Sequence, residues 1–316
     1  MKKCLALAVL CLLVVGFAGV VPAQETKLVL ATGGTAGTYY PFGGAMARIW
    51  NTKVAGMNVT VQATGASAEN VRLVDKKEAE LAIVQSDTVD FAFNAKEAFK
   101  EKLGNLRAIA VLYPEIIQLV ASGDSPVKTF ADLKGLKVGV GAPGSGTEAN
   151  FRQLLDVYGM KKEDVNAQYL SFAESAEQFK DKHIDAFIVV AGIPNSAIMD
   201  VSTSHNLKLL SLDAGKVDQL TQKYPFLSPA KVPASTYKGQ AEEVSTVAVN
   251  AVLIVGAEVK EDVVYNLTKA LFENQAELAT GHAKGKELSL EKASKGVSIP
   301  FHPGAEKFYK EKGFMK

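Results

Sequence analysis

The chain has 316 residues, a hydrophobic fraction of 47%, a charged fraction of 22% and a formal net charge of +1. This balance lacks the basic excess that holds a phosphate backbone, so no nucleic acid is expected as a partner. The length fits one large domain or two of ordinary size, and the hydrophobic fraction is ample for buried cores.

The first 23 residues have the pattern of a secretory signal peptide. Lys2 and Lys3 form a charged start, residues 5–17 are apolar and uncharged, and Val21-Pro22-Ala23 supplies small residues for cleavage. The apolar stretch is shorter than the roughly 20 residues that a membrane-spanning helix needs. We therefore expect cleavage after Ala23 and export to the periplasm.

Both cysteines, Cys4 and Cys11, lie in this expected signal, and neither follows a small residue as a lipoprotein anchor requires. Cleavage would leave a chain without cysteine, which excludes disulfides, thiolate metal sites and cysteine nucleophiles from the mature protein. Loss of Lys2 and Lys3 would also change the formal net charge from +1 to −1.

Strand and helix periodicities alternate from residue 27 onward. The expected elements are a strand at 27–31, a glycine-rich turn at 33–37, a helix from about Pro41, a strand at 58–63, a helix from Ser67, a strand at 81–84 and a helix from Ser86. This order is a βαβαβ unit with a glycine-rich first turn.

The same order recurs in the second half of the chain. The expected elements are a strand at 136–141, a turn at 142–146, a helix carrying Phe151 and Leu154, a strand at 167–170, a helix opened by a Ser171–Glu174 capping box, and a strand at 184–190. Two such units predict an α/β protein with two parallel-sheet lobes. Ligands of such sheets lie outside the carboxyl ends of the strands, so the lobes should enclose one cleft.

Two further apolar segments, 116–122 and 244–255, have no helix of their own and are interpreted as the crossings between the lobes. The segment 216–239 carries three prolines and is expected to be an irregular loop. The resulting boundaries are 25–115 plus 253–316 for the first lobe and 116–252 for the second.

The glycine-rich turns at 33–38 and 141–147 each lie between a strand and a helix. Backbone amides and the dipole at a helix N-terminus favour an anion. Neither turn has the lysine of a P-loop, and the first has no G-x-G-x-x-G, which disfavours nucleotides. Ser145 alone is equally explained as a helix cap completed by Glu148. Two turns in matched positions favour anion capture by amides and by the hydroxyls of Thr35, Ser145 and Thr147.

Other candidates also follow expected strands. Tyr39 can cover a ligand with its ring, although a tyrosine more often packs a core. Ser67 with Asn70 and the segment 85–87 offer amides and polar side chains, and helix capping is the alternative explanation for both. All of these residues fall at carboxyl ends of strands.

We find no catalytic constellation in the sequence. The four histidines lack metal-ligand spacing, and Ser145 lacks the glycine two positions earlier that a nucleophile elbow requires. None of the four arginines lies in a glycine-rich turn. Arg152, two helical turns beyond Ser145, is within reach of the cleft, but we interpret it as a salt-bridged surface residue. No catalytic residue, metal or cofactor is therefore expected.

Several motifs together resemble those of one family, in order along the chain. They are Ala31 to Pro41, Ala63 to Asn70, Val84 to Asp87, Pro143 to Thr147 and Ala191 to Pro194. These segments closely resemble the TAXI family, the TRAP-associated extracytoplasmic receptors of secondary transporters. The resemblance implies a type II periplasmic-binding-protein fold, a TRAP-type permease as partner, and a ligand such as glutamate, glutamine or 2-oxoglutarate. Ala36 and Ala66 depart from the usual glycine pattern, and their methyl groups narrow the room near the ligand.

The sequence thus predicts a non-enzymatic, monomeric receptor that holds a small carboxylate between two lobes. The alternatives are a receptor for another organic anion, a sensory protein, or an enzyme on the same fold. The candidate ligand-binding residues are Gly34, Thr35, Tyr39, Ala66, Ser67, Asn70, Gln85, Ser86, Asp87, Ser145, Gly146, Thr147 and Gly192.

Overall fold

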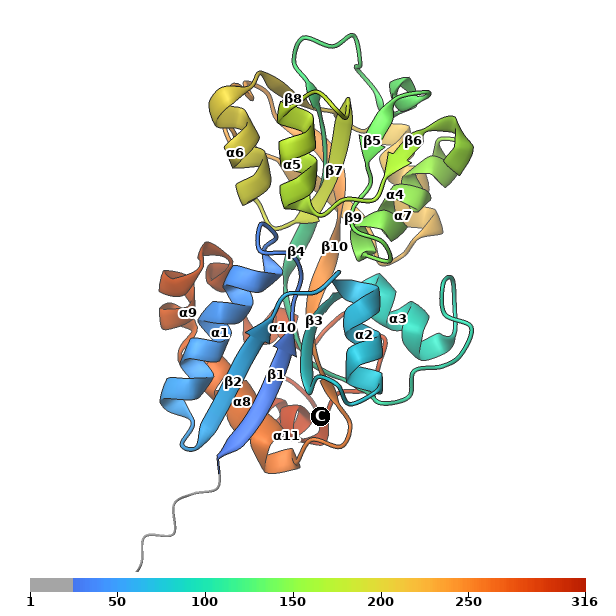
Figure 1. Cartoon of the computed structure of the whole chain (residues 1–316). Coiled ribbons are helices and arrows are strands. Elements are labelled where there is room, and N and C mark those ends of the chain that lie inside the picture. The colour runs from blue at the N-terminus through green and yellow to red at the C-terminus, as the bar shows by residue number, and fades with distance from the viewer. Residues whose placement is uncertain (1–24) are drawn as a thin grey trace, which may run out of the picture.

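The structure is a computed structural model that describes residues 25–316. Its frame consists of two groups of three parallel strands, here called triplets. One triplet has the order β2-β1-β3, with β1 (Thr26–Ala31), β2 (Met57–Gln62) and β3 (Leu81–Gln85). The other has the order β7-β5-β6, with β5 (Lys137–Gly139), β6 (Asn166–Gln168) and β7 (Ala186–Ala191). Figure 1 shows one triplet in each of two lobes. The predicted cleavage site after Ala23 lies outside the described residues.

Two long strands run from one lobe into the other (Figure 1). β4 (Leu106–Ser122) and β10 (Val244–Gly256) pair antiparallel with each other, β10 continues onto β3, and β4 continues onto β7. The short strands β8 (Leu207–Leu209) and β9 (Ser228–Val232) pair with β4 and β10. The predicted arrangement of two α/β lobes joined by two crossing strands is present, and the antiparallel pair makes the sheet mixed. The first crossing strand is longer than predicted, because buried apolar residues extend it back to Leu106.

Helices cover both faces of the sheet in each lobe (Figure 1). Those around the first triplet are α1 (Tyr39–Lys53), α2 (Ser67–Asp75), α3 (Ser86–Asn94), α8 (Glu261–Glu273), α9 (Gln275–Gly281), α10 (Leu290–Ala293) and α11 (Pro303–Glu311). Those around the second are α4 (Gly146–Val157), α5 (Phe172–Lys180), α6 (Ser196–Ser204) and α7 (Ala214–Lys223). Short 3₁₀ turns at η1 (Phe130–Leu133), η2 (Lys162–Asp164) and η3 (Ala283–Glu287) complete the chain.

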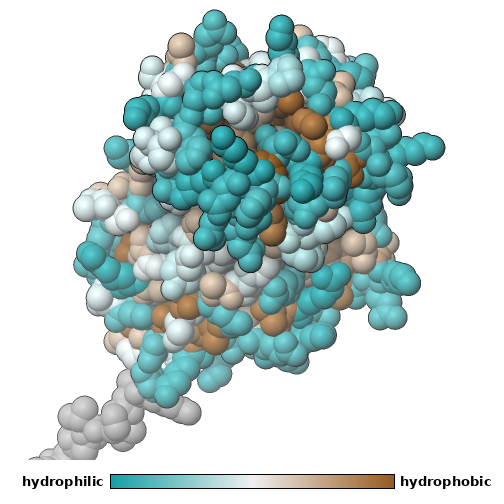
Figure 2. Space-filling view, turned by 45° about the horizontal axis from the view of Figure 1, so that its top comes forward, coloured by the Kyte–Doolittle hydropathy of each residue, from teal (hydrophilic) through white to brown (hydrophobic). Residues whose placement is uncertain are grey.

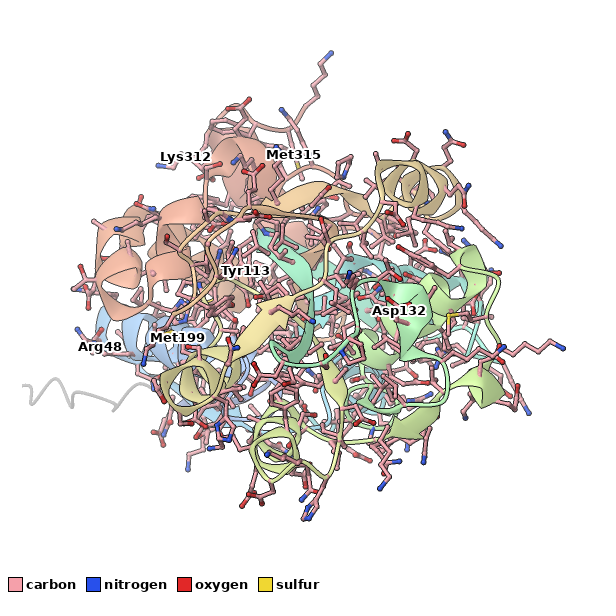
Figure 3. The ribbon with its side chains drawn as sticks, turned by 90° about the horizontal axis from the view of Figure 1, so that it is seen from above. Arg48, Tyr113, Asp132, Met199, Lys312 and Met315 are labelled. Atoms are coloured by element: carbon pink, nitrogen blue, oxygen red, sulfur yellow. The ribbon has the colours of Figure 1, made fainter. Side chains whose placement is uncertain are left out.

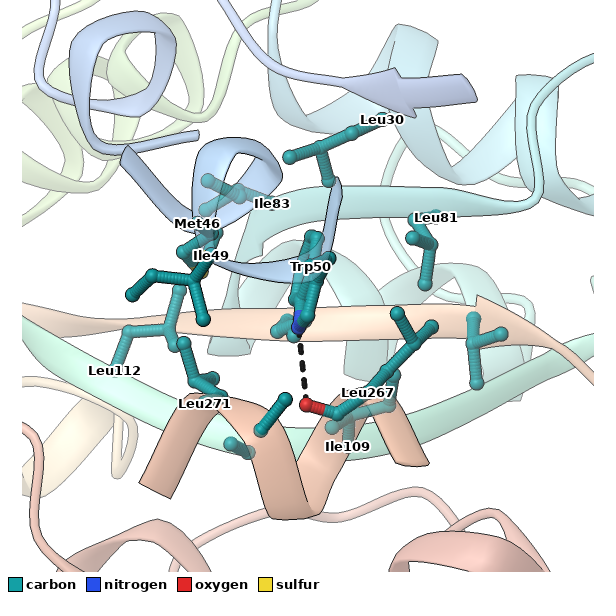
Figure 4. Close-up of a cluster of buried hydrophobic side chains, with 14 of the residues drawn as sticks. Leu30, Met46, Ile49, Trp50, Leu81, Ile83, Ile109, Leu112, Leu267 and Leu271 are labelled. Atoms are coloured by element: carbon teal, nitrogen blue, oxygen red, sulfur yellow. Dashed lines mark hydrogen bonds between the residues drawn. The ribbon is translucent and has the colours of Figure 1, made fainter. Parts of the chain in front are cut away.

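Each lobe has its own hydrophobic core. In the first lobe Trp50 is fully buried between α1 and α8, and its Nε1–H donates to the carbonyl oxygen of Leu267 at 2.9 Å (Figure 4). Four clusters of buried hydrophobic residues make up these cores. The two clusters of the first lobe contain residues up to Tyr113 and from Ala251 onward, whereas the two clusters of the second lobe contain only residues within 116–249. Apolar burial is therefore organised separately on the two sides of the crossing strands.

The expectation of an irregular loop over 216–239 was wrong. Helix α7 forms there because Val217 and Leu220, three residues apart, are buried against the second lobe. Strand β9 follows, with Pro229 opposite Val247 of β10. Proline is compatible with an edge strand, so its presence did not exclude strand structure here.

The outer surface is mainly hydrophilic on the face shown in Figure 2, with hydrophobic residues in small separate groups. Within residues 25–316, no helix combines the length and the hydropathy needed to cross a membrane.

Candidate ligand-binding site

A cavity of about 300 Å³ lies between the lobes, at the carboxyl ends of all six parallel strands. Its walls come from residues 33–39 after β1, 63–67 after β2, 85 at the end of β3, 142 and 145–147 after β5, 171–173 after β6, and 190–191 at the end of β7, together with residue 115 of β4. This is where open α/β sheets bind ligands, and the volume is at the lower end for small-molecule sites.

Five helices begin at this cavity. The residues at the N-cap positions of α1, α2, α3, α4 and α5 all line it: Thr38, Ala66, Gln85, Ser145 and Ser171. Of these, the side chains of Ser145 and Ser171 accept a hydrogen bond from their own helix. The first amides of a helix have no partner within the helix, and the helix dipole places partial positive charge at this end. Each such end favours a negatively charged group, and five of them lie around one small space.

Nine of the thirteen predicted residues line the cavity. They are Gly34, Thr35, Tyr39, Ala66, Ser67, Gln85, Ser145, Gly146 and Thr147. The remaining four, Asn70, Ser86, Asp87 and Gly192, lie outside its lining.

Asn70 is fully buried behind the cavity wall. Its Nδ2 donates to the carbonyl oxygen of Ile83 at 2.8 Å and also to that of Thr32, while its Oδ1 accepts from the Thr64 hydroxyl at 2.6 Å. The amide therefore ties the turn after β2 to β1 and β3. It positions residues 63–67 and does not itself line the cavity.

Ser86 and Gly192 are buried beside the site. Ser86 is the first residue of α3, where its backbone follows the cavity residue Gln85. A Cβ built on Gly192 would lie 2.6 Å from Cε of Lys284, so this glycine makes room for a lysine side chain.

Asp87 joins the two lobes. Its buried Oδ2 accepts from Asn150 Nδ2 at 3.0 Å and from Gln153 Nε2 at 3.5 Å, which connects α3 to α4. Burial raises the pKa of Asp87, and this effect outweighs the hydrogen bonds to the carboxylate, which lower the pKa. A second link lies at α6, where Asn195 Nδ2 and Ser196 Oγ donate to the carbonyl oxygen of Ala36 at 3.1 and 2.9 Å. Within residues 25–316, side-chain hydrogen bonds thus link the lobes at two places, in addition to the crossing strands β4 and β10.

Sequence reasoning missed Glu115, the one charged side chain among the described residues that line the cavity. It lies on β4 with 2% exposure, and its Oε2 accepts a hydrogen bond from the Tyr39 hydroxyl at 2.9 Å. Burial raises the pKa of Glu115 to about 8, assisted by the charge of Asp87 and opposed by Tyr39, Gln85 and Lys284. The only signal in the sequence was a single carboxyl group within a largely apolar strand.

The next polar side chain along β4 is that of Tyr113, which is as deeply buried as Glu115. Figure 3 shows Tyr113 near the centre of the molecule, whereas Arg48 lies at its periphery. The buried Tyr113 hydroxyl has no hydrogen-bond partner within residues 25–316, and burial together with the charge of Glu115 raises its pKa.

The cap of α4 is only half of the expected capping box. Ser145 Oγ accepts from the Glu148 amide at 3.1 Å, but the Glu148 carboxylate pairs with Arg152 instead of returning to Ser145. Arg152 therefore forms a salt bridge, as expected, and does not line the cavity. The Ser171–Glu174 capping box is present as predicted.

Ala66 has a backbone conformation that is usually reserved for glycine, with φ of 73° and ψ of −146°. The first turn of α2 requires this geometry where the chain enters the cavity wall. We expect Ala66→Gly to raise the free energy of unfolding by about 1 kcal/mol, because relief of strain exceeds the entropy that glycine loses on folding. Urea denaturation measures the change, with Ala63→Gly as the control at a cavity residue without positive φ. A destabilised Ala66→Gly variant would contradict the assignment of strain.

Solved structures resemble this arrangement at low sequence identity. A protein of Bordetella bronchiseptica RB50 matches with a TM-score of 0.55 and 18% identity, over 90% of this chain and 89% of the other. The alkanesulfonate-binding protein SsuA from Xanthomonas axonopodis pv. citri, bound to MOPS, has a TM-score of 0.53 and 15% identity over 92% of both chains. An ancestral arginine-binding protein bound to arginine has a TM-score of 0.53 and 13% identity, over 83% of this chain and 98% of the other.

These neighbours show the type II periplasmic-binding-protein fold. The comparison with protein families identifies the family as well as the fold. The model of the NMT1-like family matches residues 30–313, which is nearly all of the described chain. The chain belongs to the NMT1-like family.

Proposed function

We propose that this protein is an extracytoplasmic receptor that binds a small carboxylate between its lobes and delivers it to a membrane transporter. The observation that carries the proposal is the convergence of five helix N-termini on one cavity of about 300 Å³. Among residues 25–316, no arginine or lysine lines this cavity, so backbone amides and hydroxyl groups are the proposed anion ligands. A thermal-shift panel of acidic amino acids, dicarboxylates, 2-oxo acids and sulfonates tests this function, and the proposal fails if no member of the panel raises the melting temperature.

A role as an enzyme is the alternative from another class. Glu115 with its raised pKa is the one cavity residue suited to proton transfer, and its neighbour Tyr39 donates to it. An acid–base pair requires a second titrating group with a different pKa at the reacting atoms. Recovery of the bound compound unchanged after prolonged incubation supports the receptor, whereas a chemically altered compound identifies an enzyme.

The proposed partner is a TRAP-type permease, on the basis of the five TAXI-like motifs. The second candidate is an ABC importer, because a structural neighbour is the substrate-binding protein of an amino acid ABC transporter, with a TM-score of 0.50. Uptake into proteoliposomes that contain the purified partner permease separates the two. Transport driven by an ion gradient without ATP supports the TRAP assignment, and a requirement for ATP hydrolysis assigns the ABC system.

We further propose that the lobes are residues 25–115 plus 253–316 and residues 116–252, and that they move about β4 and β10. The separate hydrophobic clusters on either side of these strands support this division. We also propose that the protein is exported with cleavage after Ala23 and that the receptor is a monomer. N-terminal sequencing of protein from the native host should begin at Gln24.

The hydroxyl groups at the start of α4 should contribute to anion binding. Thr147 is buried in the cavity wall, and Thr147→Val deletes its hydroxyl while it keeps the branched shape. Loss of one hydrogen bond to a charged group should weaken binding about tenfold to a hundredfold in calorimetric titration with the compound found by the panel. Ser145→Ala should weaken binding too, but it also removes a helix cap worth about 1 kcal/mol.

Arg152→Ala is the control for this experiment, because Arg152 pairs with Glu148 outside the cavity. We expect it to bind like the wild-type protein. If both hydroxyl variants bind normally while Arg152→Ala abolishes binding, the anion is held by an arginine, and the proposed mode of binding is wrong.

A further inference from the structure

Helix α3 of the first lobe lies against α4 of the second lobe (Figure 1). The residue before α3, Gln85, is buried against Gly146, the first residue of α4. Asp87 follows in the first turn of α3 and bonds to the second turn of α4. Further along α3, the ring of Phe91 meets that of Phe226 edge to face, with 6.3 Å between the centroids. This contact therefore brings the start of α4, which lines the cavity, to the first lobe.

The polar groups in this contact are incompletely paired. Oδ1 of Asp87 accepts from the Thr88 amide at 2.6 Å, and Oδ2 accepts from Asn150 Nδ2 at 3.0 Å. The same Nδ2 also donates to Gln153 Oε1 at 3.0 Å, and the bond from Gln153 Nε2 to Asp87 is long, at 3.5 Å. Asn150 Oδ1 and Gln85 Oε1 are buried and have no hydrogen-bond partner among the described residues. Buried polar groups are normally paired, so a further hydrogen atom is favoured in this contact.

The carboxyl group of Asp87 is buried among neutral partners. Asp87 is 1% exposed, and the groups that donate to it belong to Thr88, Asn150 and Gln153. Burial without a positively charged partner disfavours a carboxylate and raises the pKa of Asp87. When the lobes separate, this group would exchange α4 for water, and its pKa would return toward the ordinary value of 3.8.

We propose that the contact between α3 and α4 is a pH-sensitive latch, which closes when Asp87 takes up a proton and opens when Asp87 loses it. The proton comes from the solvent and adds to the carboxylate, so no other reactant is needed. This inference rests on the proposed receptor and on its proposed motion about β4 and β10, and it adds a means of regulating that motion. Asp87 is a positioning residue, because it acts on the cavity through α4 and does not line it.

The sign of the pH dependence follows from the burial of Asp87 in the closed form alone. Between the ordinary pKa of the open form and the raised pKa of the closed form, the closed form holds a proton that the open form lacks. Lowering the pH within this interval therefore favours closure, and raising the pH through the closed-form pKa removes the advantage. For one proton, the closing equilibrium changes by at most about tenfold per pH unit.

The second link between the lobes should not respond to pH. It consists of hydrogen bonds from Asn195 Nδ2 and Ser196 Oγ to the carbonyl oxygen of Ala36, and none of these groups titrates. The two links thus differ in kind, and only the one at Asp87 can sense protons.

Other charged groups near α3 must be distinguished from Asp87. Helix α3 packs against α2, β3, β10 and α4, and the sequences of β3 and β10 contain no titratable side chain. The charged residues of α2, α3 and α4 bond within their own lobes: Glu69 to the Gly65 amide, Arg72 to the Ala68 carbonyl oxygen, Asp75 to the Asn105 amide, Asp90 to Lys96, Glu148 to Arg152, and Asp156 to Lys223. On β4, the buried Glu115 lies close enough for the charge of Asp87 to raise its pKa. Opening would affect Glu115 with the same sign, so it needs a variant of its own.

Small-angle X-ray scattering of the empty protein from pH 4.5 to pH 8, at constant ionic strength, tests the latch without a ligand. We expect the radius of gyration to increase with pH, because the open form is less compact. Asp87→Asn keeps the shape of the side chain but cannot ionise, so at pH 8 it should retain the radius that the wild-type protein has at low pH. A wild-type radius that is constant over this range, or a pH dependence that persists in Asp87→Asn, overturns the proposal.

Three variants assign the effect to Asp87. Glu115→Gln and Asp90→Asn each remove another buried carboxyl group and should keep the pH dependence; Asp90 lies one turn after Asp87 but bonds Asn94 and Lys96 of its own lobe. Ser196→Ala removes a bond of the second link and should favour the open form equally at every pH. Loss of the pH dependence in Glu115→Gln would assign the proton to Glu115 and contradict the latch.

Asn150→Asp provides the test should Asp87→Asn fail to fold. It places a second carboxyl group beside Asp87, and two adjacent carboxylates repel each other. We expect a larger radius than wild type at pH 8 and a steeper decrease as the pH falls. A wild-type radius of Asn150→Asp at every pH shows that α3 and α4 do not form the proposed latch.

Calorimetric titration with 2-oxoglutarate and with L-glutamate at pH 5, 6.5 and 8, in two buffers of different ionisation enthalpy, separates the latch from the receptor function. Since binding requires closure, a probe that binds should bind more weakly at pH 8 than at pH 5 and should take up protons, and Asp87→Asn should take up fewer. If neither probe binds while the scattering changes with pH, the proposed carboxylate specificity fails and the latch stands. Binding with constant affinity and without proton uptake overturns the latch and leaves the receptor function intact.

Discussion

The Glu115→Gln variant should be as stable as the wild-type protein near pH 4 and clearly more stable at pH 8 and above. Burial raises the pKa of Glu115 to about 8 in the folded protein, against an ordinary value of 4.5 for an unfolded chain. The folded state therefore binds more protons between these pH values, and wild-type stability falls as pH rises through them, by up to about 1.4 kcal/mol per pH unit. Glutamine cannot ionise, so the difference in unfolding free energy should widen by about 3–5 kcal/mol in total.

Urea denaturation of both proteins without added ligand, from pH 4 to pH 9, measures this difference. Other titrating groups, Asp87 among them, are common to both proteins and largely cancel in the comparison. Glu242→Gln is the matched control, because Glu242 is exposed and outside the cavity; its stability should follow the wild-type curve. A constant difference between Glu115→Gln and wild type from pH 5 to pH 9 would show that Glu115 ionises in the folded protein without penalty.

Gly146→Val should reduce ligand affinity by at least a hundredfold and leave the fold intact. Gly146 is the first residue of α4, and a Cβ built there would overlap the side chain of Gln85, which belongs to the other lobe. Gln85 is buried and lines the cavity, so it can only move into the ligand space or force the lobes apart. Either movement opposes the closed form that binds ligand, whereas the separate lobe cores remain undisturbed. Calorimetric titration gives the affinity, and small-angle scattering gives the radius of gyration with and without ligand.

Gly215→Val is the matched control for this variant. Gly215 also lies in the first turn of a second-lobe helix, α7, but a Cβ there meets nothing within 4 Å. It should therefore bind and close like the wild-type protein. Normal affinity and normal closure of Gly146→Val would mean that α4 and Gln85 do not approach each other in the bound form.

The parts of the site that were predictable are those encoded locally. Residues 33–38 and 141–147 combine glycine with helix-starting residues after apolar strands, which fixes both the turns and the position of the cavity wall. Ser171 and Glu174 likewise form their cap from a local pattern. Because parallel strands end at one edge of a sheet, separate local patterns were sufficient to bring nine predicted residues together.

The parts that were missed depend on contacts between segments distant in the sequence. Nothing near Glu115 indicates that its carboxyl group lines a cavity and meets Tyr39, 76 residues away. Asp87 was singled out as a polar residue after a strand, yet its partner Asn150 lies on α4 of the other lobe. Helix α7 was missed because neighbouring prolines outweighed the short spacing of its two buried residues.

The bonds from Asp87 to α4 and from α6 to Ala36 have a consequence for the rate of transport. They are made by protein groups alone, so in the proposed motion about β4 and β10 they would lower the free energy of the closed conformer whether or not the cavity is filled. Apparent affinity rises with the fraction of empty molecules that are already competent to bind, so these bonds tighten capture at low solute concentration. The same population shift gives empty receptors the shape that a permease would recognise. Such receptors would occupy the transporter without a ligand. Stronger links would therefore raise the affinity for the ligand but lower the rate at which loaded receptors reach the transporter.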